Sequence, residues 1–265
     1  MAVIRSLLLA VVVVALTSAP VGADGGAAVV LTPDQMLEMF DGAELDGVRT
    51  RSLYPWITGN IAADEQIYEL AERQGYKLRG GYGGPRVEVA GVPLHPAAAA
   101  AFEGLMAAAQ LDGVTLTPNF GLRTVDHQRL LFRARLHASA ERIAAGDADA
   151  TVIATMELVA PPGFSKHHTG YTIDLSTSDG YRWLTQDNYI NVKDFGWLPS
   201  YPTGATSEYG PNPEIWEFVY VGVETIQCQL SCVLAPPPTP SRPTQGSTAM
   251  FGGVPPYVRV ILGLD

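Results

Sequence analysis

The stretch at residues 165–174, SKHHTGYTID, combines residue types that bind metal ions. His167 and Asp174 are seven positions apart, and Gly170 between them allows the backbone to turn tightly. A Pro-Pro-Gly loop at 161–163 precedes the stretch, and an apolar run ends it. This pattern predicts that a loop and the strand after it present two ligands to one metal ion.

A hydrolytic zinc site needs three protein ligands, an open position for water and a carboxylate base beside that water. Two carboxylates, Glu214 and Glu217, precede an apolar run at 218–223 that predicts a strand. Residues three apart on a flat strand face opposite sides, so the joint action of the two carboxylates requires a turn. Pro211 and Pro213 favour such a turn just before the strand.

Three separated blocks of the sequence together resemble one known family. Residues 165–174 match the S-x-H-x-x-G-x-x-x-D signature of the D-alanyl-D-alanine carboxypeptidase family of zinc peptidases, whose VanY-like branch trims peptidoglycan stem peptides. Upstream, GLRT at 121–124 and Gln128 resemble the family's G-Y-R-S segment and the glutamine that follows its arginine. Downstream, EIWEFVYVG at 214–222 is similar to the family's E-x-W-H segment and the next strand, and FGWLPSYP at 195–202 also resembles the family.

The resemblance implies a role for each matching residue and Zn²⁺ as the cofactor. His167 and Asp174 are implied as metal ligands and Glu214 as the general base. Arg123 is implied as a cation that holds a carboxylate or stabilises a tetrahedral oxyanion. Positions behind the ligands or against the substrate are implied for four further residues: Ser165, Gln128, His168 and Trp216.

The chain departs from the family at Glu217, where the family has a histidine as its third ligand. Three interpretations stay open. Glu217 is itself the third ligand, in which case two carboxylates acidify the bound water less and favour Mn²⁺ or another oxygen-preferring ion beside Zn²⁺. Alternatively, His168 or His127 supplies the ligand. In the third interpretation the site is inactive and only binds.

The leading hypothesis is an exported metal-dependent peptidase that hydrolyses the terminal bond of peptidoglycan stem peptides and releases D-alanine. In this hypothesis Glu214 moves the proton and Arg123 stabilises negative charge. One alternative is a catalytically impaired protein that binds wall peptides on the same fold. The other is an endopeptidase that cuts a different stem-peptide bond.

The resemblance implies a compact α+β domain in which a small, mainly antiparallel sheet carries the metal and helices flank the sheet. The residue patterns predict helices at 60–74, 96–110 and 125–145, and a capping box at Thr32 predicts an earlier one. Residues 146–150 are predicted as a loop. Strands are predicted in five places: 87–92, 114–118, 171–175, 195–201 and 218–223.

The two ends of the chain differ in composition from its middle. Residues 1–23 have the charged start, apolar run and small-residue cleavage site of a secretory signal peptide, and the run is too short for a stable membrane span. We therefore expect a secreted or periplasmic protein. An N-terminal extension is expected at 24–59, a peptidase domain at 60–234 and a proline-rich tail at 235–265.

The formal net charge of −10 argues against attraction to nucleic acid or to anionic lipid. We expect a monomer whose partner is the stem peptide. The two cysteines, Cys228 and Cys232, form either a local disulfide or two free thiols, and the sequence leaves both possibilities open.

Overall fold

The computed structural model describes residues 29–145, 148–176, 180–205 and 212–228, together with residues 260 and 263. The expected signal peptide and nearly all of the proline-rich tail lie outside these residues. Within the described part, no helix combines the length and the apolar character that a membrane span requires.

The fold is α+β, and its centre is a four-stranded antiparallel sheet. The sheet consists of β5 Pro118–Phe120, β6 Thr172–Leu175, β7 Trp197–Pro199 and β8 Glu217–Tyr220, in the spatial order β5-β6-β8-β7. Two further antiparallel pairs form separate two-stranded sheets: β1 Val48–Arg49 with β2 Gly81–Tyr82, and β3 Val87–Val89 with β4 Val92–Leu94.

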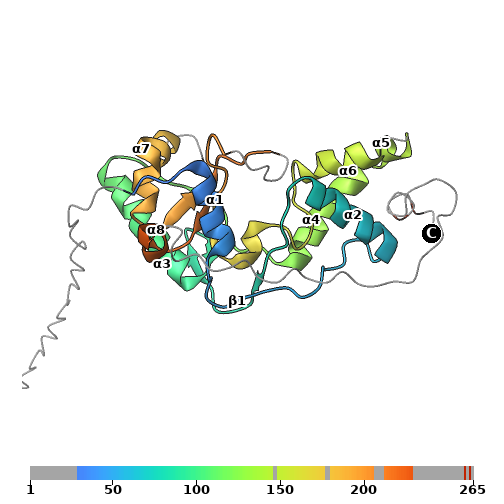
Figure 1. The fold of residues 1–265 in the computed structure, drawn as a ribbon, viewed down its shortest axis with the longest axis horizontal. Helices are drawn as coiled ribbons and strands as arrows, with labels where there is room; N and C mark the ends of the chain where they lie inside the picture. Colours follow the sequence, from blue (N-terminus) through green and yellow to red (C-terminus); the bar gives the residue numbers. More distant parts are fainter. Residues whose placement is uncertain are drawn as a thin grey trace, which may run out of the picture.

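The helices gather at the two ends of the molecule (Figure 1). One end holds α1 Pro33–Gly42, α3 Pro96–Leu111, α7 Tyr181–Lys193 and α8 Val223–Cys228. The other end holds α2 Ile61–Arg73, α4 Val125–Ala138, α5 Ala140–Ala144 and α6 Ala148–Met156, and α6 contacts the other three. A short 3₁₀ helix, η1 Lys166–Thr169, contacts β6 and β2.

Side-chain oxygens cap the starts of α1, α2 and α4, and the ring of His95 caps α3. Thr32 forms the predicted capping box with Gln35 at the start of α1, which satisfies backbone donors that no helical carbonyl can reach. Asn60 accepts from the backbone N–H of Ala63 at the start of α2. Thr124 does the same for His127 and thereby fixes the first turn of α4, directly after the loop that carries Arg123.

Two hydrophobic clusters anchor the 165–174 stretch. The helical cluster is formed by Ile57, Ala63, Ile67, Tyr68, Leu70, Ala71, Phe132, Leu136, Ile143, Val152, Met156 and Phe164. The sheet cluster is formed by Val89, Leu94, Ala98, Ala99, Phe102, Leu105, Ala109, Leu116, Tyr171, Ile173, Leu175, Leu184, Val192, Trp197 and Phe218. Each large apolar side chain buried in them contributes about 1.5–3 kcal/mol. Because Phe164 belongs to the first cluster and Tyr171 to the second, the stretch between them is anchored at both ends.

The described part of the expected N-terminal extension packs against the sheet. Met36, Met39 and Phe40 of α1 are buried together with Leu198 of β7 and Val219 of β8. The amphipathic face of α1 therefore covers the edge of the sheet on which the strand carrying Glu217 pairs with β7.

Several predicted elements have different bounds in the structure. The strands expected at 195–201 and 218–223 are shorter, at Trp197–Pro199 and Glu217–Tyr220. The single strand expected at 87–92 is a hairpin, because Ala90 and Gly91 both adopt positive φ and reverse the chain. The strand expected at 114–118 begins only at Pro118.

The long helix expected at 125–145 ends at Ala138, and α5 and α6 follow it. Ser139 leaves helical geometry, with ψ near 8°, so the chain turns and α6 can pack against α2. The predicted loop at 146–150 accordingly contains the start of α6.

The sequence left open whether the cysteines form a disulfide or stay free. In the structure, Cys228 at the end of α8 is disulfide-bonded. The chain's other cysteine, Cys232, lies outside the described residues.

Candidate metal centre

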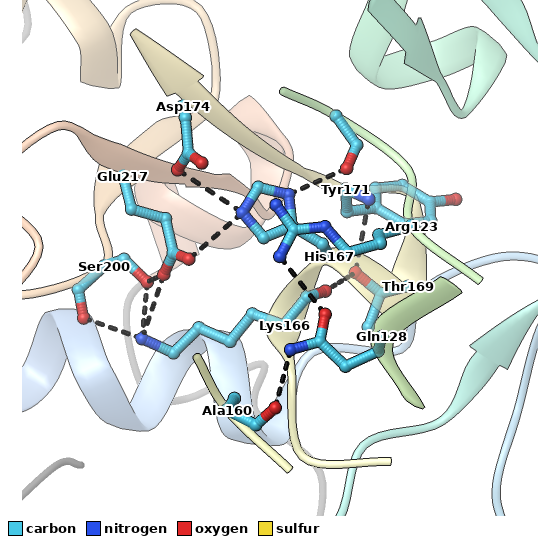
Figure 2. A network of polar contacts seen from close by, with 11 residues as sticks. Arg123, Gln128, Ala160, Lys166, His167, Thr169, Tyr171, Asp174, Ser200 and Glu217 are labelled. Carbon is cyan, nitrogen blue, oxygen red and sulfur yellow. Dashed lines mark hydrogen bonds and ion pairs between the residues drawn. The ribbon is translucent and has the colours of Figure 1, made fainter. Parts of the chain in front are cut away.

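Three side chains from three elements converge on one point (Figure 2). Asp174 on β6 and Glu217 on β8 are direct cross-strand partners, so their side chains leave the sheet on the same face. His167 comes from η1, and its Nε2 lies 3.3 Å from Asp174 Oδ1 and 3.3 Å from Glu217 Oε2. One candidate ligand atom from each residue lies within 4.8 Å of the others, and all three residues are buried.

The hydrogen bonds around this cluster fit a bound cation. His167 Nδ1 lies 2.7 Å from the carbonyl oxygen of Gly121. A carbonyl can only accept, so Nδ1 carries a proton and Nε2 is the atom available to a metal. Asp174 Oδ1 is buried and has no hydrogen-bond partner among the described residues. Three lone pairs therefore face one another, and either a proton or a metal ion must separate them.

The charges of the cluster favour a cation in the same place. Burial alone lowers the pKa of His167, but Asp174 and Glu217 outweigh burial and raise it to about 10. The two carboxylates thus hold a positive charge at Nε2, which is the position that a divalent ion takes when it displaces that proton. One imidazole nitrogen and two carboxylate oxygens are an acceptable ligand set for zinc.

Glu217 is held by two residues that the sequence did not single out. Lys166 Nζ lies 3.3 Å from Glu217 Oε1, and the Ser200 hydroxyl donates to the same oxygen. Burial raises the pKa of Glu217, but Lys166 and His167 outweigh burial and bring it below its ordinary value. Burial also lowers the pKa of Lys166 to about 8, against the attraction of Glu217. No spacing signal could have found Lys166, because it occupies a variable position of the motif.

Glu214 and Glu217 are joined by the turn that their spacing requires. The N–H of Glu217 donates to the carbonyl of Glu214 at 2.9 Å, and residues 215 and 216 form the turn. Both carboxylates consequently line the same cavity of about 240 Å³. Burial, followed by the charges of Glu217 and Asp174, raises the pKa of Glu214 to about 8, which makes it a stronger base than an exposed glutamate.

Arg123 and Gln128 also line this cavity. Arg123 Nη1 donates to Gln128 Oε1 at 3.1 Å, and Gln128 Nε2 donates to the carbonyl of Ala160 at 2.6 Å (Figure 2). The backbone N–H of Arg123 donates to the carbonyl of His167 at 3.1 Å. This chain of contacts fixes a guanidinium in the cavity that contains the three converging atoms.

The other histidines considered from the sequence do not join the cluster. His168 Nδ1 donates to the carbonyl of Arg123 at 2.7 Å, and its Nε2 accepts from the N–H of Gly163 at 3.0 Å. Both ring nitrogens are occupied, so the ring links the loop at Arg123 to the loop at Gly163. Burial lowers the pKa of His168 to about 3. His127 is exposed on α4.

The remaining predicted site residues, Ser165 and Trp216, both line the cavity. Ser165 is buried, and its carbonyl accepts from the N–H of His168 at 3.2 Å. Trp216 is 41% exposed and forms part of the wall. The cavity also includes Tyr76 and Tyr201, which the sequence did not indicate as site residues.

Gly170 has a backbone conformation that other residues avoid, so Gly170→Ala is expected to destabilise the protein by about 1–2 kcal/mol. Its φ is +76°, and an added Cβ meets Tyr82 Cδ1 at 3.2 Å. Denaturant unfolding measures the change. Gly83→Ala is the control, because a Cβ there meets nothing within 4 Å. Equal midpoints for the two variants contradict the turn described here.

The chain was compared with protein-family models, curated proteins and solved structures. A protein-family model described as VanY, D-alanyl-D-alanine carboxypeptidase, matches residues 91–223, which is half of the 265-residue chain. A search of curated proteins found no match. Three solved structures are similar to this chain in part of their sequence and fold.

VanYB in complex with D-alanine-D-alanine is 28% identical, with a TM-score of 0.46, and the match covers 56% of this chain and 82% of that one. A Zn(II) complex of a mutant of the vancomycin resistance D,D-pentapeptidase VanY is 27% identical, with a TM-score of 0.45 and coverage of 55% and 83%. DacB from Streptococcus pneumoniae is 26% identical, with a TM-score of 0.38 and coverage of 52% and 72%. From the match of the family model, the chain belongs to the VanY family of D-alanyl-D-alanine carboxypeptidases.

Proposed function

We propose that this protein is a metal-dependent carboxypeptidase that removes the terminal D-alanine from peptidoglycan stem peptides. The convergence of His167, Asp174 and Glu217 in one cavity with Glu214 carries this proposal. Zn²⁺ is the proposed cofactor. The two carboxylates among the proposed ligands also make Mn²⁺ suitable.

The proposed chemistry divides between the cofactor and the chain. A divalent ion at this position supplies Lewis acidity, which activates water and polarises a carbonyl. Glu214 accepts the proton of the attacking water on a carboxylate oxygen and returns it to the departing amine nitrogen. Its raised pKa, about 8, suits both transfers near neutral pH.

Arg123 is proposed to hold negative charge on the substrate. Its guanidinium is oriented by Gln128, which is itself tied to the carbonyl of Ala160, so little reorganisation is needed when charge develops. We propose that Trp216 forms an apolar wall of the substrate site. Ser165 and His168 support the loops behind the ligands.

We further propose that residues 1–23 direct export, so that the protein acts as a secreted or periplasmic monomer on the cell wall. The peptidase domain is proposed to span residues 60–234. The mass of the mature N-terminus of the secreted protein tests the predicted cleavage after Ala23.

The proposed activity is tested with purified protein and a pentapeptide that ends in D-alanyl-D-alanine. We expect about one equivalent of metal per chain and release of D-alanine when Zn²⁺ or Mn²⁺ is supplied. Mass analysis of the products identifies the bond that is cut. Cleavage at another bond replaces the proposal with an endopeptidase, and peptide binding without cleavage replaces it with a binding protein.

A further inference from the structure

Lys166 is a buried cation for which the reaction proposed above has no use. Its side chain is 7% exposed, and lysine is almost never buried without a partner. Its ammonium group donates to the Ser200 hydroxyl and, at 3.1 Å, to the Ser200 carbonyl, and it lies 3.9 Å from the centre of the Tyr201 ring. It also lies 3.3 Å from Glu217 Oε1.

The two oxygens of Glu217 consequently have different surroundings. Oε1 faces Lys166 and accepts from the Ser200 hydroxyl, whereas Oε2 faces Nε2 of His167 at 3.3 Å (Figure 2). The backbone reinforces this arrangement, because the N–H of Ser200 donates to the carbonyl of Glu217 at 2.9 Å. Rotation of the carboxylate would break both contacts on Oε1, so only Oε2 is presented to the metal position.

The inference rests on the metal site proposed above. We propose that Lys166 is a positioning residue that, together with Ser200, holds Oε1 of Glu217 so that this glutamate acts as a ligand through Oε2 alone. A one-oxygen ligand keeps a coordination position open for water or substrate. Lys166 and Glu217 together carry no net charge, and a neutral histidine ligand carries none either. We therefore expect a histidine ligand at position 217 to be tolerated only when Lys166 is also replaced by an uncharged residue.

The first test compares Lys166→Met with the unmodified protein. We expect the affinity for Zn²⁺, measured by chelator competition, to fall about ten- to a hundredfold, the usual cost of losing a residue that orients a ligand. With Co²⁺ in place of Zn²⁺, visible absorption should weaken, because a released Glu217 binds through both oxygens and raises the coordination number. Lys77→Met is the matched control, since Lys77 lines the same cavity but pairs with Asp41. It should leave both readouts unchanged.

The direction of the change in Zn²⁺ affinity distinguishes a positioning role of Lys166 from a purely electrostatic one. If Lys166 acts only as a nearby positive charge, its removal strengthens metal binding, and this result overturns the proposal. Unchanged affinity and an unchanged Co²⁺ spectrum also overturn it. A native protein that binds no Zn²⁺ and releases no D-alanine overturns the proposed function itself, and the role of Lys166 as a positioning residue with it.

The second test exchanges both residues. Glu217→His alone leaves Lys166 buried beside a neutral ring, so we expect weak Zn²⁺ binding and a lower melting temperature. Adding Lys166→Met should restore both, because the double variant contains neither a buried unpaired charge nor a missing ligand. Equal Zn²⁺ affinity in the single Glu217→His and the double variant shows no coupling and contradicts the proposal.

Discussion

Asp174→Asn is expected to lower the affinity for Zn²⁺ by at least about a hundredfold, the upper end of the loss seen for residues that only support ligands. The amide keeps the shape of the side chain but removes the charge of a buried oxygen that lies 3.3 Å from Nε2 of His167. D-alanine release should fall by at least a similar factor. Chelator competition and the peptide assay measure the two effects.

Thermal unfolding gives an independent readout of the same substitution. At a Zn²⁺ concentration of about 100 times the native Kd, binding stabilises the native protein by about 2.7 kcal/mol, and a hundredfold weaker site leaves about 0.4 kcal/mol. Asp46→Asn is the control, because the Asp46 side chain is 95% exposed. If Zn²⁺ stabilises Asp174→Asn as strongly as the native protein, Asp174 is not a ligand.

Glu214→Gln is expected to reduce the rate of D-alanine release by about 10²–10⁴-fold, the usual contribution of a general base, which corresponds to about 3–5 kcal/mol in the activation barrier. The amide cannot accept the proton of water. Because Glu214 is not one of the three converging residues, metal content should stay at the native value. Rate measurements at saturating peptide, with metal analysis of the same sample, test both statements.

The matched control for this variant is Glu224→Gln, since Glu224 is exposed on α8. It should keep the native rate. A Glu214→Gln variant that loses its metal points instead to a role in building the site. One that retains full activity assigns the base to another residue.

The sequence was sufficient to predict the α+β class and the residues that meet at the centre. The spacing of His167 and Asp174 implied a shared site, and Pro213 implied the turn that brings Glu214 and Glu217 into one cavity. The register that places Asp174 opposite Glu217 was not predictable, because it depends on how β6 and β8 pair across more than forty residues.

Other features were hidden for local reasons. Ala90 adopts a positive φ that alanine rarely takes, so a hairpin had the appearance of one alternating strand. Lysine normally keeps its charge in water, so nothing marked Lys166 as buried. The alanine-rich sequence after Ala138 favours helix, so the break at Ser139 between α4 and α5 was not predicted.

The helical cluster and the sheet cluster support different parts of the site around the 165–174 stretch. His167, Asp174 and Glu217 all belong to η1 and the sheet, whereas Gln128 belongs to α4, whose buried side chains pack in the helical cluster. Loosening α2, α4 or α6 would therefore act directly on Gln128 and on the guanidinium that it orients, whereas it would reach His167 only indirectly, through Phe164 and the contact with Arg123. We therefore expect packing changes in the helical cluster to alter affinity for the proposed peptide substrate more than affinity for the ion.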